Sequence, residues 1–119
     1  MSIESLLKDL VSRVEGATGA IVLAADGEAV KWCATAGVLL RLRGAYVSVL
    51  LQSCRASGVL SKVGNMRSFV VEYEGASFVA QQIDDYSFIA LELSASANIA
   101  EAMFRLGPAV AELCREFAL

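Results

Sequence analysis

The sequence predicts an α+β fold, a two-face sandwich in which helices cover both faces of a five-stranded antiparallel sheet. Segments with a helical period precede, separate and follow two groups of apolar strands. The turns between successive strands are short, as in antiparallel hairpins. The strands are apolar on both sides, so both faces of the sheet need a cover. The predicted order is helix, strand, strand, helix, strand, strand, strand, helix.

The first third of the chain is predicted to hold one helix and one hairpin. Apolar residues recur at helical spacing over residues 2–15, with Ser2 as N-cap and Gly16 as the residue that ends the helix. A continuous apolar run over residues 18–25 is typical of a strand covered on both faces. Asp26-Gly27 is a strong hairpin signal, and a second strand is expected over residues 28–34.

The remaining two thirds are predicted to form a long helix, a meander of three strands and a final helix. Their expected ranges are residues 38–60, 67–74, 77–83, 86–93 and 96–117. Turn residues at Glu74-Gly75 and Asp84-Asp85 separate the three strands. Gly107-Pro108 interrupts the last helical pattern, so a kink or a break is expected there, because proline removes a backbone hydrogen bond.

The composition predicts one domain, residues 1–119, with surplus apolar surface. Hydrophobic residues make up 56% of the 119 residues and charged residues 19%, against about 45–50% and about 25% in average soluble domains. The excess favours an oligomer over a tightly packed monomer. The apolar runs are far shorter than the roughly 18 residues of a spanning helix, so membrane insertion is not expected.

Charge and cysteine content narrow the possible functions. The net charge is −3 and the ten basic residues are scattered, which disfavours nucleic-acid binding. Three cysteines lack metal-ligand spacing and the chain has no histidine, so no metal site is expected. We interpret the cysteines as free thiols in a reducing cytoplasm, in keeping with an N-terminus without a visible secretory signal.

No catalytic constellation is visible either. Without histidine, the usual Ser-His-Asp and Cys-His arrangements cannot form. The adjacent carboxylates Asp84 and Asp85 are interpreted as a solvated turn, and the glycines Gly58 and Gly64 lack the spacing of a phosphate-binding loop. The sequence therefore predicts a non-enzymatic protein, with no catalytic, cofactor-binding or metal-binding residues.

The helix over residues 38–60 has more apolar surface than one core needs. At the helical step its apolar residues cover roughly 220° of the circumference, whereas one core needs only a little more than about 100°. They form two adjacent stripes, Val38, Leu42, Ala45, Tyr46 and Val49 in one, and Leu39, Leu40, Val47, Leu50, Leu51 and Cys54 in the other. Arg41, Ser48, Gln52 and Arg55 form a narrow polar sector. We interpret the second stripe as a surface for association.

These elements resemble the Roadblock/dynein light-chain family. The resemblance rests on residues 14–30, which hold a helix end, a glycine, a strand and an Asp-Gly hairpin, and on the later turns at Gly75 and Asp84-Asp85-Tyr86. The entry to the last helix at Ala97-Asn98-Ile99 also fits, so the resemblance covers about residues 3–117. It implies a Roadblock/profilin-like fold and favours the bacterial branch that resembles a gliding-motility regulator of a GTPase.

The resemblance also implies how the protein associates and with what. A homodimer would form through the middle helix and the following strand, with the two sheets joined edge to edge, and would bind, regulate or scaffold a small Ras-like GTPase. The expected dimer interface comprises Leu39, Leu40, Arg43, Val47, Leu50, Leu51, Cys54, Phe69, Val71 and Tyr73. Changing Leu50 or Leu51 to Glu is expected to give monomers or aggregates. Arg43 would need a partner at this interface or would have to extend to solvent.

Four questions stay open at this point. The sequence does not name the GTPase or other partner, separate stimulation of hydrolysis from tethering, or distinguish homodimers from heterodimers. It also does not decide which apolar stripe of the middle helix faces the partner. A small-molecule sensor domain of the PAS or GAF type is the alternative, because such domains also combine a sheet with helices at this length. An enzyme of unknown type is a third hypothesis.

Overall fold

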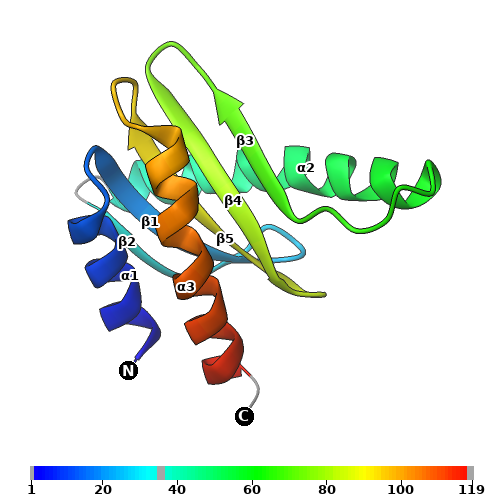
Figure 1. Cartoon of the computed structure of the whole chain (residues 1–119), viewed down its shortest axis with the longest axis horizontal. Coiled ribbons are helices and arrows are strands. Elements are labelled where there is room, and N and C mark those ends of the chain that lie inside the picture. Colours follow the sequence, from blue (N-terminus) through cyan, green and yellow to red (C-terminus); the bar gives the residue numbers. More distant parts are fainter. Residues whose placement is uncertain (1, 35–36, 118–119) are drawn as a thin grey trace.

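Helices lie on both faces of a five-stranded antiparallel sheet in the computed structural model, which describes residues 2–34 and 37–117 (Figure 1). The elements are α1 (Ile3–Arg13), β1 (Ala17–Ala24), β2 (Ala29–Ala34), α2 (Gly37–Leu60), β3 (Ser68–Glu72), β4 (Ala76–Asp84), β5 (Ser87–Ser94) and α3 (Ile99–Phe117). Their order is the one that the sequence predicts, and no boundary differs by more than three residues. The predicted fold class is confirmed.

The strands follow the order β2-β1-β5-β4-β3 across the sheet, and every neighbouring pair is antiparallel. The β1–β2 hairpin turns at Asp26-Gly27 as predicted. Gly27 has φ +88°, a conformation that glycine adopts at little cost, and the Asp26 carboxylate accepts a hydrogen bond from the Glu28 N–H at 3.0 Å. β2 and β3 are the two edge strands, so their outer N–H and C=O groups face away from the sheet.

Helices α1 and α3 cover one face of the sheet, in front in Figure 1. Leu7 of α1 and Leu106 and Leu113 of α3 are fully buried there, against Val22 and Leu91 of the sheet. The outer side of α1 is polar, as the helical period of its apolar residues predicts, whereas that of α3 carries Arg105 together with the exposed ring of Phe104.

Of the kink or break expected in the last helix, the break is not present. α3 continues from Ile99 to Phe117 with Pro108 inside it. Pro108 and the preceding Gly107 are exposed, so the ring has solvent beside it and the helix continues past the one backbone donor that proline lacks.

Helix α2 covers the opposite face and packs mainly on β1 and β2. Two glycines allow this close approach. A Cβ atom on Gly19 of β1 would lie 2.8 Å from the Leu40 side chain, and one on Gly44 of α2 would lie 3.2 Å from Ile21. The core on this side joins Leu40, Val47 and Leu51 of α2 to apolar residues of the sheet, namely Ile21, Leu23, Phe78, Ala80, Phe88 and Ala90.

Candidate interaction surface on α2 and β3

The buried inner side of α2 includes three of the six residues of the second stripe, which was expected to contact a partner. Leu40, Val47 and Leu51 are at most 2% exposed, because they pack into the chain's own core. The assignment of these three residues to a dimer interface is therefore corrected. The other members of that stripe, Leu39, Leu50 and Cys54, are exposed.

The polar sector of α2 also faces the chain itself. Ser48 is buried. Gln52 donates a hydrogen bond from Nε2 to the carbonyl of Ala25 at 2.5 Å, and Arg55 donates from Nη1 to the carbonyl of Asp85 at 2.9 Å. These polar side chains bind the turns that end β1 and β4, so they hold α2 against the sheet.

The side of α2 that faces outward is apolar. Leu39, Leu42, Tyr46 and Val49 are between 52% and 68% exposed. Their spacing of three, four and three residues is the spacing of a seam between two packed helices. We call these four residues the outer stripe; Leu50, which is 41% exposed, lies beside it. A helix that turns its polar sector inward and an apolar stripe outward is unusual for a lone domain.

An ion pair joins α2 to the sheet beside this stripe. Arg43 donates from Nε and Nη2 to the two carboxylate oxygens of Glu92, at 2.6 and 2.8 Å. Glu92 is only 6% exposed and also accepts a 2.8 Å hydrogen bond from Thr18, which a bulge in β1 turns toward it. The hydrogen bonds from Arg43 to the Glu92 carboxylate raise the pKa of Arg43 above its ordinary value. The interaction that Arg43 was expected to need is thus within the chain.

The sequence reading missed Glu92, although it held a signal for it. Glu92 is the one charged residue in the otherwise apolar stretch from Phe88 to Leu93. A carboxylate in a buried strand needs a charged or hydrogen-bonding partner. Arg43, a basic residue among the apolar residues of α2, was the matching candidate.

Strand β3 provides an open sheet edge next to α2, as the resemblance implied. Phe69 and Val71 are half-buried and pack on the α2 side, so most of their contact is with the chain's own core. Val70 points to the other face and is 40% exposed. Tyr73, just after the strand, is exposed, and its ring meets the ring of Phe78 edge-on at a centroid distance of 6.4 Å.

A surface groove of about 510 Å³ lies between α2 and the β3–β4 turn. It is called the α2–β4 groove below. Its lining residues are Arg43, Tyr46, Val47, Tyr73, Gly75, Ala76, Phe78 and Glu92. Its wall is therefore mostly apolar, and the Arg43–Glu92 ion pair forms one part of it.

The opposite edge of the sheet, β2, is occupied by charged side chains. Lys31 forms an ion pair with Glu4 of α1 at 3.3 Å. The guanidinium of Arg41 lies 4.6 Å from the centre of the Trp32 ring, within the range of a cation–π contact. The β2 edge is thus bordered by charged side chains, whereas the β3 edge is open.

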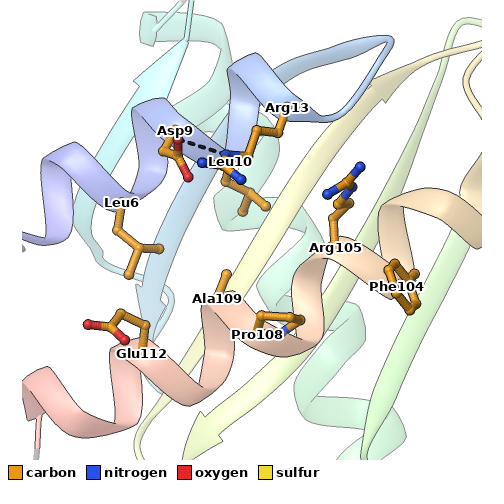
Figure 2. Close-up of a pocket in the computed structure, with 9 residues that line it drawn as sticks. All are labelled: Leu6, Asp9, Leu10, Arg13, Phe104, Arg105, Pro108, Ala109 and Glu112. Carbon is orange, nitrogen blue, oxygen red and sulfur yellow. Dashed lines mark hydrogen bonds and ion pairs between the residues drawn. The ribbon is translucent and has the colours of Figure 1, made fainter.

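A second groove, of about 430 Å³, lies on the other face between α1 and α3. Figure 2 shows Leu6, Leu10 and Ala109 at its apolar part. Charged side chains surround it, and Asp9 accepts a hydrogen bond from Arg13 at 2.9 Å. Phe104 at its margin is exposed.

The described residues offer little for metal or membrane chemistry. Within residues 2–34 and 37–117, no group of three or more His, Cys, Asp or Glu side chains could hold a metal ion. In the same part of the chain, no helix is both long and apolar enough to cross a bilayer.

The chain is a two-face α/β domain in which an apolar side of a helix lies next to an open strand edge. This combination is typical of domains that associate with another protein surface. No protein-family model matches the sequence, and comparison with curated proteins gives no match. Solved structures do match it. A Roadblock/LC7 domain from Streptomyces avermitilis aligns with a TM-score of 0.90 and 20% sequence identity, over 100% of both chains.

Gliding-motility proteins align as well. MglC from Myxococcus xanthus has a TM-score of 0.76 and 22% identity, with 98% of this chain and 99% of that chain covered. The gliding protein MglB from Thermus thermophilus has a TM-score of 0.80 and 14% identity, with 93% and 84% covered. Profilin IA from Acanthamoeba castellanii aligns at 0.64 and 14%, over 97% and 98%. The chain therefore has the Roadblock/LC7 fold, which is related in architecture to profilin, as the resemblance implied.

Proposed function

We propose that the chain is a non-enzymatic interaction module that forms a homodimer, and that the dimer binds and regulates or scaffolds a small Ras-like GTPase in the cytoplasm. The dimer interface would comprise the outer stripe of α2 together with Leu50, Cys54 and the free edge of β3. This set replaces the buried residues Leu40, Val47 and Leu51 with exposed ones, namely Leu42, Tyr46 and Val49.

The observation that carries the dimer proposal is the outward apolar side of α2. Burying a large apolar side chain is worth about 1.5–3 kcal/mol, so several exposed ones at a helix-packing spacing favour a second surface over water. The free N–H and C=O groups of β3 would find partners in the same strand of a second copy. Arg43 does not oppose this, because Glu92 already pairs with its charge.

The GTPase proposal rests on the fold and on the resemblance. The chain shares its fold over nearly its full length with MglC from Myxococcus xanthus and with the gliding protein MglB from Thermus thermophilus. The resemblance to that bacterial branch implies a GTPase partner, which the dimer would affect by positioning the partner's own catalytic residues. The alternative of a PAS or GAF sensor is not proposed, because the similar structures are Roadblock and profilin folds.

The dimer is tested by the mass of the protein in solution. Sedimentation of the unmodified chain over a hundredfold range of concentration should give twice the mass of the 119-residue chain at the upper end. Leu42→Glu should give the mass of one chain with an unchanged far-UV spectrum. A dimer that persists in Leu42→Glu would place the interface elsewhere.

The GTPase partner is tested by a pull-down with small Ras-like GTPases from the same genome, each loaded with GDP or with a non-hydrolysable GTP analogue. Binding that depends on the nucleotide, and hydrolysis rates with and without the dimer, would separate regulation from tethering. If no GTPase of the set is retained in either state, the proposal of a GTPase partner is overturned, while the dimer stands or falls by its own measurement.

A further inference from the structure

We infer that the end of α2 in one copy fills the α2–β4 groove of the other copy, so that each chain completes the apolar surface of its twin. The end of α2, called the α2 tip, consists of Val59, Leu60 and Val63. This inference rests on the proposed homodimer. It names a contact that would make the pairing of the two copies specific. The residues of the tip lie outside the outer stripe, and the groove shares only Tyr46 with it.

The α2 tip is the most exposed apolar feature of the described chain. Leu60 is 82% exposed and Val63 is 81% exposed, more than any other large hydrophobic residue that is exposed. Figure 1 shows that the last turns of α2 extend past β3, beyond the edge of the sheet. Among the residues that the structure describes, Leu60 and Val63 are therefore left largely uncovered.

The tip is held in one conformation. The N–H groups of Val63 and Gly64 both donate to the carbonyl of Gly58, at 3.0 and 3.2 Å, which folds the chain back against the helix end. Lys62 and Gly64 have φ of 64° and 99°, as this turn requires. The packing is tight, since a Cβ atom on Gly58 would lie 2.6 Å from the Gly64 oxygen. A tip fixed in this way loses little entropy when it binds.

Two-fold symmetry brings the tip to the groove. If two β3 edges pair and both α2 helices stay on the same face, the two-fold axis is perpendicular to the sheet and the β3 strands run antiparallel. The beginning of one β3, at Ser68, then lies beside the end of the other. Val63 precedes Ser68 by only five residues, and Tyr73, which follows the end of β3, lines the α2–β4 groove.

The groove matches the tip in chemistry. It is about 510 Å³, and Tyr46, Tyr73 and Phe78 give it an apolar wall. Its one ion pair, Arg43 with Glu92, is already satisfied within the chain. Two aliphatic side chains would therefore displace water from aromatic surface without leaving a charge unpaired. Because the contact is isologous, it forms twice in each dimer.

The experiment uses engineered cysteines in the full chain, with Cys33, Cys54 and Cys114 first replaced by Ser and the fold and mass verified. A copy with Leu60→Cys is mixed with a separately tagged copy with Tyr73→Cys and oxidised. The control replaces the second copy by one with Phe104→Cys, since Phe104 is more exposed than Tyr73, at 76% against 53%, but lies on α3 at the opposite face. We expect the disulfide yield with Tyr73→Cys to exceed that of the control at least tenfold.

The outcomes separate this inference from the proposed function. A dimer whose Leu60→Cys copy links to Tyr73→Cys no better than to Phe104→Cys overturns the tip contact and leaves the homodimer. A monomer overturns both. As a second measurement, Leu60→Asp should raise the dissociation constant of the dimer at least tenfold, whereas Lys62→Ala on the same turn should change it less than twofold. Equal effects of these two changes would also overturn the inference.

Discussion

The two faces of the sheet are covered by helices with similar apolar inner sides, but these helices expose different residues to solvent. On the α1–α3 face, Leu7, Leu106 and Leu113 point inward. The outer side of α1 is polar, and that of α3 exposes Phe104 but no continuous apolar stripe like that of α2. On the α2 face, both the buried side and the outer stripe are apolar, while Gln52 and Arg55 bind the sheet's own turns. The comparison teaches that the two faces differ in what they leave to solvent: the α2 face exposes an apolar stripe that the proposed dimer would cover.

The largest expected effect comes from two neighbouring residues on opposite sides of α2. Leu51→Glu places a charge in a fully buried position and should destabilise the chain by roughly 4 kcal/mol or more. Leu50→Glu should change the stability of the isolated chain by only about 0.5–1 kcal/mol and weaken the dimer roughly 100-fold. Urea unfolding and sedimentation of both variants check this. If Leu51→Glu gave a stably folded monomer, Leu51 would not belong to the buried inner side of α2.

A second comparison uses the same substitution on the two faces. Leu106→Ala in the α1–α3 core should cost about 2–5 kcal/mol at every protein concentration, since it leaves a cavity. Leu42→Ala, on the outer stripe, should cost little in dilute solution and more as the concentration rises, because it acts through the dimer. Thermal unfolding at two concentrations a hundredfold apart distinguishes them. If both variants lost the same stability at the two protein concentrations, Leu42 would not act through a dimer and the proposed difference between the two faces would be contradicted.

A third test concerns the ion pair at the edge of the outer stripe. Arg43→Met leaves the Glu92 carboxylate with Thr18 alone and should cost about 2–3 kcal/mol. That is less than the 3–5 kcal/mol of a fully buried pair, because Arg43 is 39% exposed. Adding Glu92→Leu to Arg43→Met should recover most of the loss. A double variant no more stable than the single one would show that Glu92 is not left unpaired by the loss of Arg43.

The smallest effect is expected on the surface of the α1–α3 face. Asp9→Asn breaks the exposed pair with Arg13 shown in Figure 2 and should change the free energy of unfolding by less than about 0.5 kcal/mol. It should leave the mass in solution unchanged, since the proposed dimer forms through α2 and β3. A change of oligomeric state in Asp9→Asn would mean that the α1–α3 groove also takes part in assembly.

Local patterns in the sequence predict the elements well, because each depends on neighbours in the chain. The helical period over residues 2–15 and the Asp26-Gly27 turn need no distant contact to be recognised. The orientation of α2 is different. Val47 and Leu50 are equally apolar in the sequence, and only the path of α2 over β1 decides that Val47 is buried and Leu50 is exposed.

The polar residues of α2 show why composition misleads here. A polar sector on a helix is ordinarily its solvated side. In this chain Gln52 and Arg55 instead satisfy the carbonyls of Ala25 and Asp85, which belong to turns 27 and 30 residues away in the sequence. Such partners are defined by the tertiary structure, so they could not be assigned from the helix alone. The same is true of Arg43 and Glu92, which are 49 residues apart.

The charged border of β2 has a consequence for the size of the assembly. A sheet with two equally receptive edges could add further chains without end and grow into a filament. Arg41, stacked on Trp32, places a cation at the β2 border, where a second identical border would meet like charge. Lys31 adds no net charge there because Glu4 pairs with it, but the side chains of this pair would have to move before another strand could pack closely. Growth would therefore stop once the β3 borders are joined, and the product would be a closed pair.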